Sequence, residues 1–152
     1  MKRRRGGGDG GREPGPESGG STRRAEGRRV RAAGRATGRV WEDAASEYLA
    51  RRGVPTLLRG YQCRFGELDL VCADGDYLVV VEVRARSSSR FASAKSSVDV
   101  FKQRKIVLAT RHLLMRRPEW HDRSLRFDVV AIEGIESEAP EIEWIRNAFD
   151  AA

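Results

Sequence analysis

A nearly continuous apolar run at residues 77–83, YLVVVEV, constrains the fold more than any other part of the chain. A strand with one wet face alternates apolar and polar side chains, whereas a strand covered on both faces is apolar throughout. We therefore expect this run to be a mid-sheet strand that is covered on both faces. One carboxylate, Glu82, interrupts it. A charged group in such a strand needs a partner, because burying it alone is costly.

Two other segments carry the 3.6-residue period of an amphipathic helix. The first helix is expected over residues 40–53, where Gly53 ends it. The second is expected over residues 96–118 and begins with a capping box formed by Ser96 and Asp99. The apolar stripe of the first helix comprises Trp41, Ala44, Ala45, Tyr48 and Leu49. The stripe of the second comprises Val98, Phe101, Ile106, Ala109 and Leu113.

Extended patterns account for most of the remaining chain after residue 39. Strands are expected at residues 56–65, 67–72, 77–83 and 125–133. The tetrapeptide ADGD, centred on Asp74 and Gly75, is a turn signal that joins the second and third strands in a hairpin. Residues 142–149 form either a last strand or a docking segment. The order helix, three strands, helix, strand and tail predicts an α/β fold with a sheet of mixed direction.

The N-terminal segment differs in composition from the rest. Residues 1–39 hold 12 of the 29 basic side chains, 4 of the 22 acids and 11 of the 16 glycines, so they carry +8 while the remainder carries −1. Almost no large apolar side chain is present to offset the entropy lost on ordering. We expect residues 1–37 to be a disordered Arg/Gly-rich arm and residues 38–152 to be one domain. The arm fits salt-sensitive attraction to a polyanion, and it fits equally an extension without function.

Several classes of protein are disfavoured. A secretory signal requires an apolar run after its basic residues, and no such run follows the basic N-terminal residues here. No segment approaches the ~20 apolar residues of a membrane helix. Cys63 and Cys72 form no CxxC pair and are interpreted as reduced thiols. These features predict a cytoplasmic protein without a membrane partner.

Three acids lie in the expected hairpin: Glu67, Asp69 and Glu82. With the turn at ADGD, Asp69 faces Val80 and is a diagonal neighbour of Glu82 on one sheet face, roughly 7–8 Å away at Cα. Glu67 is then directly opposite Glu82. Carboxylates at this separation can hold one divalent ion, and oxygen-only ligands favour Mg²⁺ or Mn²⁺. The alternative is a structural patch in which Arg84 neutralises Asp69 and Glu82.

Three segments carry a resemblance to a known family: GELDLVCADGDYLVVVEVRAR, SSVDVFKQRKI and LRFDVVAI. In this order and at these distances they resemble the YraN-like uncharacterised bacterial family, which is similar to Holliday-junction-resolvase-like PD-(D/E)xK nucleases. The resemblance covers residues 38–149. It implies a restriction-endonuclease-like mixed central sheet flanked by helices. It also implies an endonuclease that hydrolyses phosphodiesters in DNA with Mg²⁺ or Mn²⁺ and acts as a homodimer.

The resemblance assigns the acidic ligands residue by residue. The acid of the second core strand falls on Asp69, and the Glu of the E-x-K motif falls on Glu82. The carbonyl of Val83 would be a further metal ligand, and the first-helix acid of resolvase-like members falls on Glu42. Asp128, in the segment RFDVV, is expected to pair with a basic residue rather than to act in catalysis.

The basic positions of the motif fall on Arg84, Arg86 and Lys102. Arg86 and Lys102 would bind the nucleic-acid backbone. Arg84 stands where the motif has Lys, and Arg remains protonated and cannot act as a base. Arg84 would contribute a fixed positive charge in catalysis. The substitution also favours an alternative function, a catalytically inactive nucleic-acid-binding module on the same fold.

Overall fold

The structure, a computed structural model, describes residues 37–87 and 98–151. All but the last residue of the expected arm at 1–37, together with Ser96, lies outside the described residues. In the described part of the chain, no helix combines the length and apolar character needed to cross a membrane.

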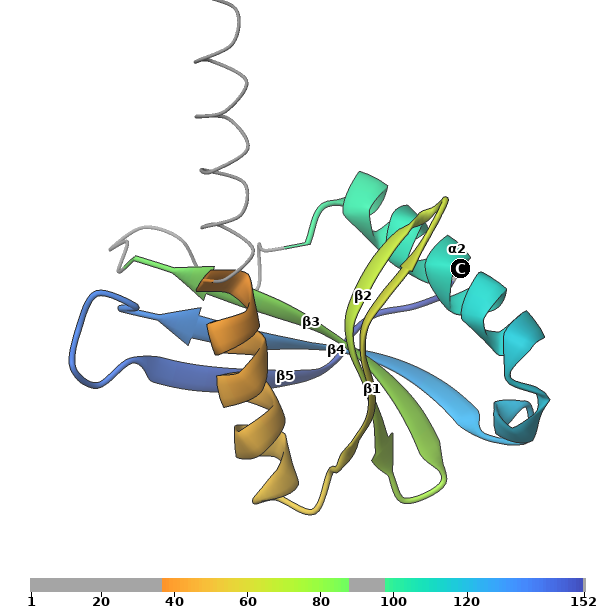
Figure 1. The fold of residues 1–152 in the computed structure, drawn as a ribbon, viewed down its shortest axis with the longest axis horizontal. Helices are drawn as coiled ribbons and strands as arrows, with labels where there is room; N and C mark the ends of the chain where they lie inside the picture. The colour runs from red at the N-terminus through yellow and green to blue at the C-terminus, as the bar shows by residue number, and fades with distance from the viewer. Residues whose placement is uncertain (1–36, 88–97, 152) are drawn as a thin grey trace, which may run out of the picture. The chain divides into compact units, whose positions relative to one another are not determined.

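One five-stranded sheet organises the described residues (Figure 1). A first helix covers residues 37–50. The elements that follow are β1 (Thr56–Cys63), β2 (Gly66–Asp74), β3 (Tyr77–Arg86), α2 (Val100–Arg116), the short 3-10 helix η2 (Pro118–Trp120), β4 (Ser124–Glu133) and β5 (Glu141–Phe149). The strands lie in the order β1-β2-β3-β4-β5. Only the β3–β4 pair is parallel, while the other pairs are antiparallel.

This architecture confirms the predicted α/β fold with a mixed sheet and is consistent with a restriction-endonuclease-like fold. The segment at 142–149, left open between strand and docking segment, lies in the edge strand β5. The parallel β3–β4 pair requires a crossover connection, and α2 lies within it.

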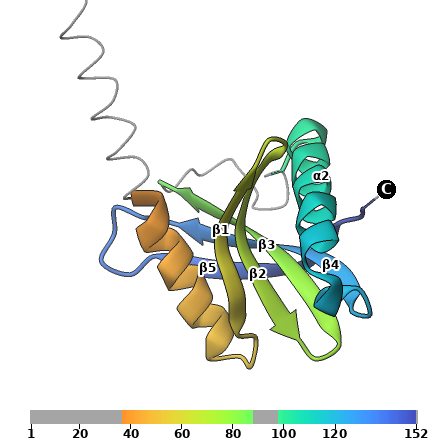
Figure 2. The ribbon, with the colours of Figure 1, turned by 45° about the vertical axis from the view of Figure 1, so that its right-hand side comes forward.

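The central strand β3 is covered on both faces, as its apolar run predicts. Leu78 and Val80 pack in a cluster with Ile106 of α2. Val79 and Val81 pack in a second cluster with residues of the first helix, including Leu49. The two helices therefore cover different faces of the sheet (Figure 2).

The first helix packs as its stripe predicts. Ala45 and Leu49 are fully buried, and Trp41, Ala44 and Tyr48 are partly buried against the same cluster. After the helix, Gly53 adopts φ +79°, a left-handed conformation that glycine adopts without steric cost.

Two predictions for the second helix are wrong. The helix begins at Val100, and Asp99 rather than Ser96 is its N-cap, because the Asp99 carboxylate accepts a hydrogen bond from the Lys102 backbone N–H at 2.8 Å. Phe101 is 67% exposed instead of lying in the core. It precedes the buried Ile106 by five residues, which places it about 140° round the helix from the inward face.

Candidate active site

The hairpin between β2 and β3 turns one residue later than predicted. Asp74 pairs with Tyr77, so Gly75 and Asp76 form the loop, and Gly75 takes the positive φ of +57° that a tight hairpin needs. Every pairing shifts by two residues, and Val71 rather than Asp69 faces Val80. An even shift leaves each side chain on its predicted face, so the prediction that Asp69 and Glu82 share a side does not depend on this error.

Asp69 lies where β2 parts from β3. The pairing of β2 with β3 ends at Leu70–Val81. Beyond this pair, the backbone N–H of Val83 donates a hydrogen bond to the side chain of Asp69, at 2.8 Å from Oδ2. Leu68 and Leu70 would share a face in a regular strand, yet Leu68 packs with the α2 cluster and Leu70 with the first-helix cluster. The alternation of β2 is therefore broken at Asp69, and its carboxylate takes the position of a strand partner.

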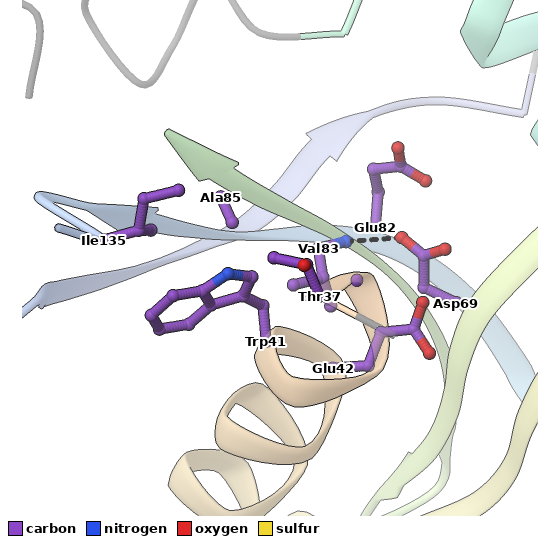
Figure 3. Close-up of a pocket in the computed structure, with 9 residues that line it drawn as sticks. Thr37, Trp41, Glu42, Asp69, Glu82, Val83, Ala85 and Ile135 are labelled. Carbon is purple, nitrogen blue, oxygen red and sulfur yellow. Dashed lines mark hydrogen bonds between the residues drawn. The ribbon is translucent and has the colours of Figure 1, made fainter. Parts of the chain in front are cut away.

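The predicted ligands meet in one cavity of about 330 Å³ (Figure 3). Glu42 enters it from the first helix, Asp69 from β2, and Glu82 and Val83 from β3. Trp41 lines the same cavity. All four residues that the sequence assigns to a metal therefore line a single space, although they come from three elements.

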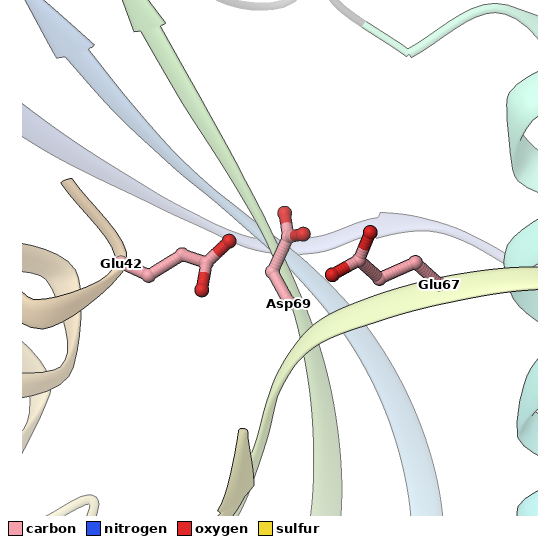
Figure 4. Close-up of side chains that lie close together, drawn as sticks. All are labelled: Glu42, Glu67 and Asp69. Carbon is pink, nitrogen blue, oxygen red and sulfur yellow. The ribbon is translucent and has the colours of Figure 1, made fainter. Parts of the chain in front are cut away.

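A fourth acid joins this group. One carboxylate oxygen from each of Glu42, Glu67 and Asp69 lies within 4.8 Å of the other two (Figure 4). Glu67 is exposed and had been expected to face Glu82, not to join a ligand set with Glu42. Its spacing of two residues from Asp69 on the same strand is the sequence signal that could have placed it in the set.

The predicted basic residues separate into two groups. Lys102 reaches from α2 to Glu82, with 3.3 Å between Nζ and Oε1, so it lies at the acids rather than only at a binding surface. Arg84 and Arg86 are partly buried on β3, and neither is among the described residues that line the cavity. Lys102 is thus a basic side chain that pairs with a cavity carboxylate, whereas the motif position is occupied by Arg84.

Comparison with known proteins identifies the family. The model of the uncharacterised protein family UPF0102 matches residues 41–132, more than half of the chain. The chain belongs to the UPF0102 family. A UPF0102 protein from Ectopseudomonas mendocina is 47% identical over 116 residues, which cover 75% of this chain and 94% of the relative. One from Pseudomonas paraeruginosa is 41% identical over 122 residues, covering 80% and 98% of the two chains.

The UPF0102 match extends from the first helix to β4. It therefore includes all the acids that meet at the cavity and also Lys102. Residues 1–40 precede the matched region, so the basic arm is not part of it.

Burial and repulsion from neighbouring acids raise the pKa of Glu42, Asp69 and Glu82 in this UPF0102 domain. Loss of water raises the pKa of Glu82 to about 7, the charge of Asp69 adds to the effect, and Lys102 opposes it. Burial, followed by the charges of Asp69 and Glu67, also raises the pKa of Glu42 to about 7. Burial raises the pKa of Asp69 too, although the Val83 N–H and Lys102 work against this. Without a further cation, the site therefore disfavours the fully ionised state.

We expect the metal-free protein to lose stability as the pH rises from about 4.5 to above about 7. Glu82 has a pKa of about 7 when folded and near 4.5 when unfolded, so the unfolded chain releases its proton first. The contribution of Glu82 to the free energy of unfolding is fully present below about pH 4.5. It declines as the pH rises through the folded pKa of about 7. Urea unfolding in EDTA at about pH 5 and about pH 8 measures the loss, and Glu82→Gln should reduce it. An equal loss in the Glu82→Gln variant would contradict the prediction.

Asp128 has a structural role, as expected. It is fully buried and accepts hydrogen bonds from Nε and Nη2 of Arg126, Nε1 of Trp144 and the backbone N–H of Asn147, each at 2.9 Å. The register between β4 and β5 shifts between Phe127 and Val129, which flank Asp128. Its carboxylate therefore supplies acceptors where the strand pairing is interrupted.

Proposed function

We propose that this UPF0102 protein is a divalent-metal-dependent nuclease that hydrolyses phosphodiester bonds in DNA. The observation that carries the proposal is the meeting of Glu42, Asp69 and Glu82 in one cavity, with Glu67 beside them. Such a cluster destabilises the metal-free domain, because burial and repulsion raise the pKa of Glu42, Asp69 and Glu82. A site that is unfavourable without a cation is expected where a cation is part of the working state.

The donor set fits Mg²⁺ or Mn²⁺. The side chains that would hold the ion, Asp69 with Glu42, Glu67 and Glu82, offer only oxygen atoms, which hard divalent cations prefer. The carbonyl of Val83 is proposed as a further ligand. A bound ion of this kind lowers the pKa of water and stabilises negative charge on a phosphate.

Lys102 is proposed to supply the positive charge next to the carboxylates. Its Nζ lies 3.3 Å from Glu82, and its side chain is 40% exposed, so it is accessible to a phosphate group as well. We assign to Lys102 the place beside the carboxylates that the motif gives to the Lys at position 84, and its role there is that of a positive charge. Arg84 and Arg86 are proposed to contribute fixed charge and to bind the DNA backbone from β3.

The test is cleavage of labelled DNA by the purified full chain. Branched, nicked and continuous duplexes are incubated with Mg²⁺ or Mn²⁺, and EDTA is the negative control. The expected result is cleavage that requires the metal. Absence of cleavage on every substrate with either ion would refute the proposal. Sedimentation in the same buffer tests the homodimer that the resemblance implies.

Replacing Lys102 by Ala should lower kcat by about 10- to 100-fold, the usual effect of removing a group that supports a metal site. Lys105→Ala is the matched control, because Lys105 lies one turn later on α2 and contacts the ring of Phe101, 4.6 Å from the ring centroid to Nζ. Lys105→Ala should change KM rather than kcat. A kcat loss in Arg84→Ala but not in Lys102→Ala would place the catalytic charge on Arg84 instead.

A nucleic-acid-binding module without turnover is the second candidate. Arg84 in the Lys position favours it, as does the composition of α2, which carries five Lys or Arg side chains and no acid. Calorimetric titration with Mn²⁺ separates the two functions. A bound ion supports the nuclease, whereas DNA binding that weakens steeply with salt, without any bound ion, supports the module.

A further inference from the structure

Phe101 is a large apolar side chain that is exposed on α2, the helix that carries Lys102. It is 67% exposed on the first turn of α2, although its place in the apolar stripe predicted burial. The next residue, Lys102, makes the ion pair with Glu82. Phe101 therefore precedes, by one position in the first turn of α2, the residue that connects this helix to the acidic cavity.

The surroundings of Phe101 select an anionic partner. All five charged side chains of α2 are basic, and Arg104 and Lys105 are exposed close to Phe101 in the sequence. Lys105 lies over the aromatic ring, with Nζ 4.6 Å from its centroid. Two copies of this face would repel each other, because both carry the same charge. Basic side chains interleaved with an exposed aromatic ring are the combination that binds single-stranded nucleic acid.

We propose that Phe101 stacks on an unpaired base next to the phosphate held at the acidic cavity. The substrate class is then DNA with an unpaired nucleotide, either single-stranded or at a branch. Bases inside a continuous duplex already stack on their neighbours, and exposing one requires unstacking energy. The position of the phosphate rests on the proposed nuclease function, whereas the stacking contact itself needs no metal.

The experiment measures binding in EDTA, so that no cleavage is required. Fluorescence anisotropy of the full chain with a labelled single strand and with the matching duplex gives two affinities for each variant. Phe101→Ala should weaken single-strand binding by about 5-fold or more, the effect of losing one stacked base, and leave duplex binding within about 2-fold. Phe101→Trp should retain the single-strand affinity. The ratio of the two affinities cancels sequence-independent attraction by the arm and by other basic residues.

Leu108→Ala is the matched control. Leu108 is exposed on α2 seven residues after Phe101, so the two side chains lie on nearly the same side of the helix, but Leu108 has no aromatic ring. Its affinity ratio should equal that of the unmodified protein. An unchanged ratio in Phe101→Ala, or an equal loss in Leu108→Ala, would refute stacking.

Failure of the two proposals is distinguishable. If Phe101→Ala changes the ratio but the protein neither binds Mn²⁺ nor cleaves DNA, the stacking site stands and the nuclease function fails. If the protein cleaves DNA with Mg²⁺ or Mn²⁺ and the ratio is unchanged, the nuclease stands and the stacking site fails.

Discussion

Replacing Asp69 by Asn should lower the affinity for Mn²⁺ by at least about 100-fold and abolish metal-dependent cleavage. Outer-sphere changes at metal sites already cost up to about 100-fold, and Asp69 is proposed as a direct ligand. Asp69 also interacts with each of the other three acids at the cavity. Its carboxylate lies with those of Glu42 and Glu67, and its charge raises the pKa of Glu82. Its loss therefore removes one proposed ligand and also removes the charge that acts on Glu42 and Glu82.

The Asn variant should fold, which makes the result interpretable. The Asp69 carboxylate accepts a hydrogen bond from the Val83 N–H, and the carbonyl oxygen of Asn can accept the same bond. The repulsion that Asp69 exerts on Glu42 and Glu82 disappears with its charge. The metal-free variant is therefore expected to be at least as stable as the unmodified protein near pH 8.

Calorimetric titration with Mn²⁺ and the cleavage assay measure the two effects, and Asp43→Asn is the control. Asp43 is the neighbour of Glu42, but its exposed side chain pairs with Arg59 instead of joining the acid cluster. It should leave metal binding and cleavage unchanged. Equal cleavage by the Asp69→Asn variant and the unmodified protein would identify a contaminating nuclease, and equal Mn²⁺ affinity would exclude the acidic cavity as the metal site.

Replacing Asp128 by Ala should destabilise the domain by about 3–5 kcal/mol, the usual loss when one partner of a buried ion pair is removed. Asp128 is fully buried, and Ala can accept none of its hydrogen bonds from Arg126, Trp144 and Asn147. Domains of this size are stable by only about 5–15 kcal/mol, so the variant would lose a large fraction of its stability.

The reason for this large effect is the irregular pairing of β4 with β5. Asn147 adopts φ +48°, which is uncommon for a residue other than glycine, and its N–H is bound by Asp128 rather than by a strand partner. Arg126 would keep its bond to Asp74 but lose both bonds to Asp128. Donors left without their acceptor, above all the Arg126 guanidinium, whose side chain is only 13% exposed, account for most of the expected loss.

Urea unfolding measures the free energy of unfolding of the Asp128→Ala variant and of a control variant, Glu47→Ala. Glu47 forms an ion pair with Arg51 on the exposed surface of the first helix, and such pairs contribute at most about 1 kcal/mol. A loss below about 1 kcal/mol for Asp128→Ala would show that water or neighbouring groups replace the carboxylate.

The resemblance in the sequence located much of the candidate site. It assigned Glu42, Asp69 and Glu82 as metal ligands, and these acids line one cavity in the structure. The hairpin calculation placed Asp69 and Glu82 on one side despite an error of two residues in register, because the side-chain period of a strand is two. The spacing of two residues relates Glu67 to Asp69 on one strand, but no local pattern shows how close β2 comes to Glu42 of the first helix.

The apolar run at 77–83, the amphipathic first helix and the alternation of helices and strands follow from local periodicity, which the sequence records directly. The tertiary structure alone decided the contact of Lys102 with Glu82, the exposure of Phe101 and the break in β2 at Asp69. These depend on how α2 is rotated against the sheet and on where two strands separate. Such features arise from packing between segments distant in the chain, which no local pattern encodes.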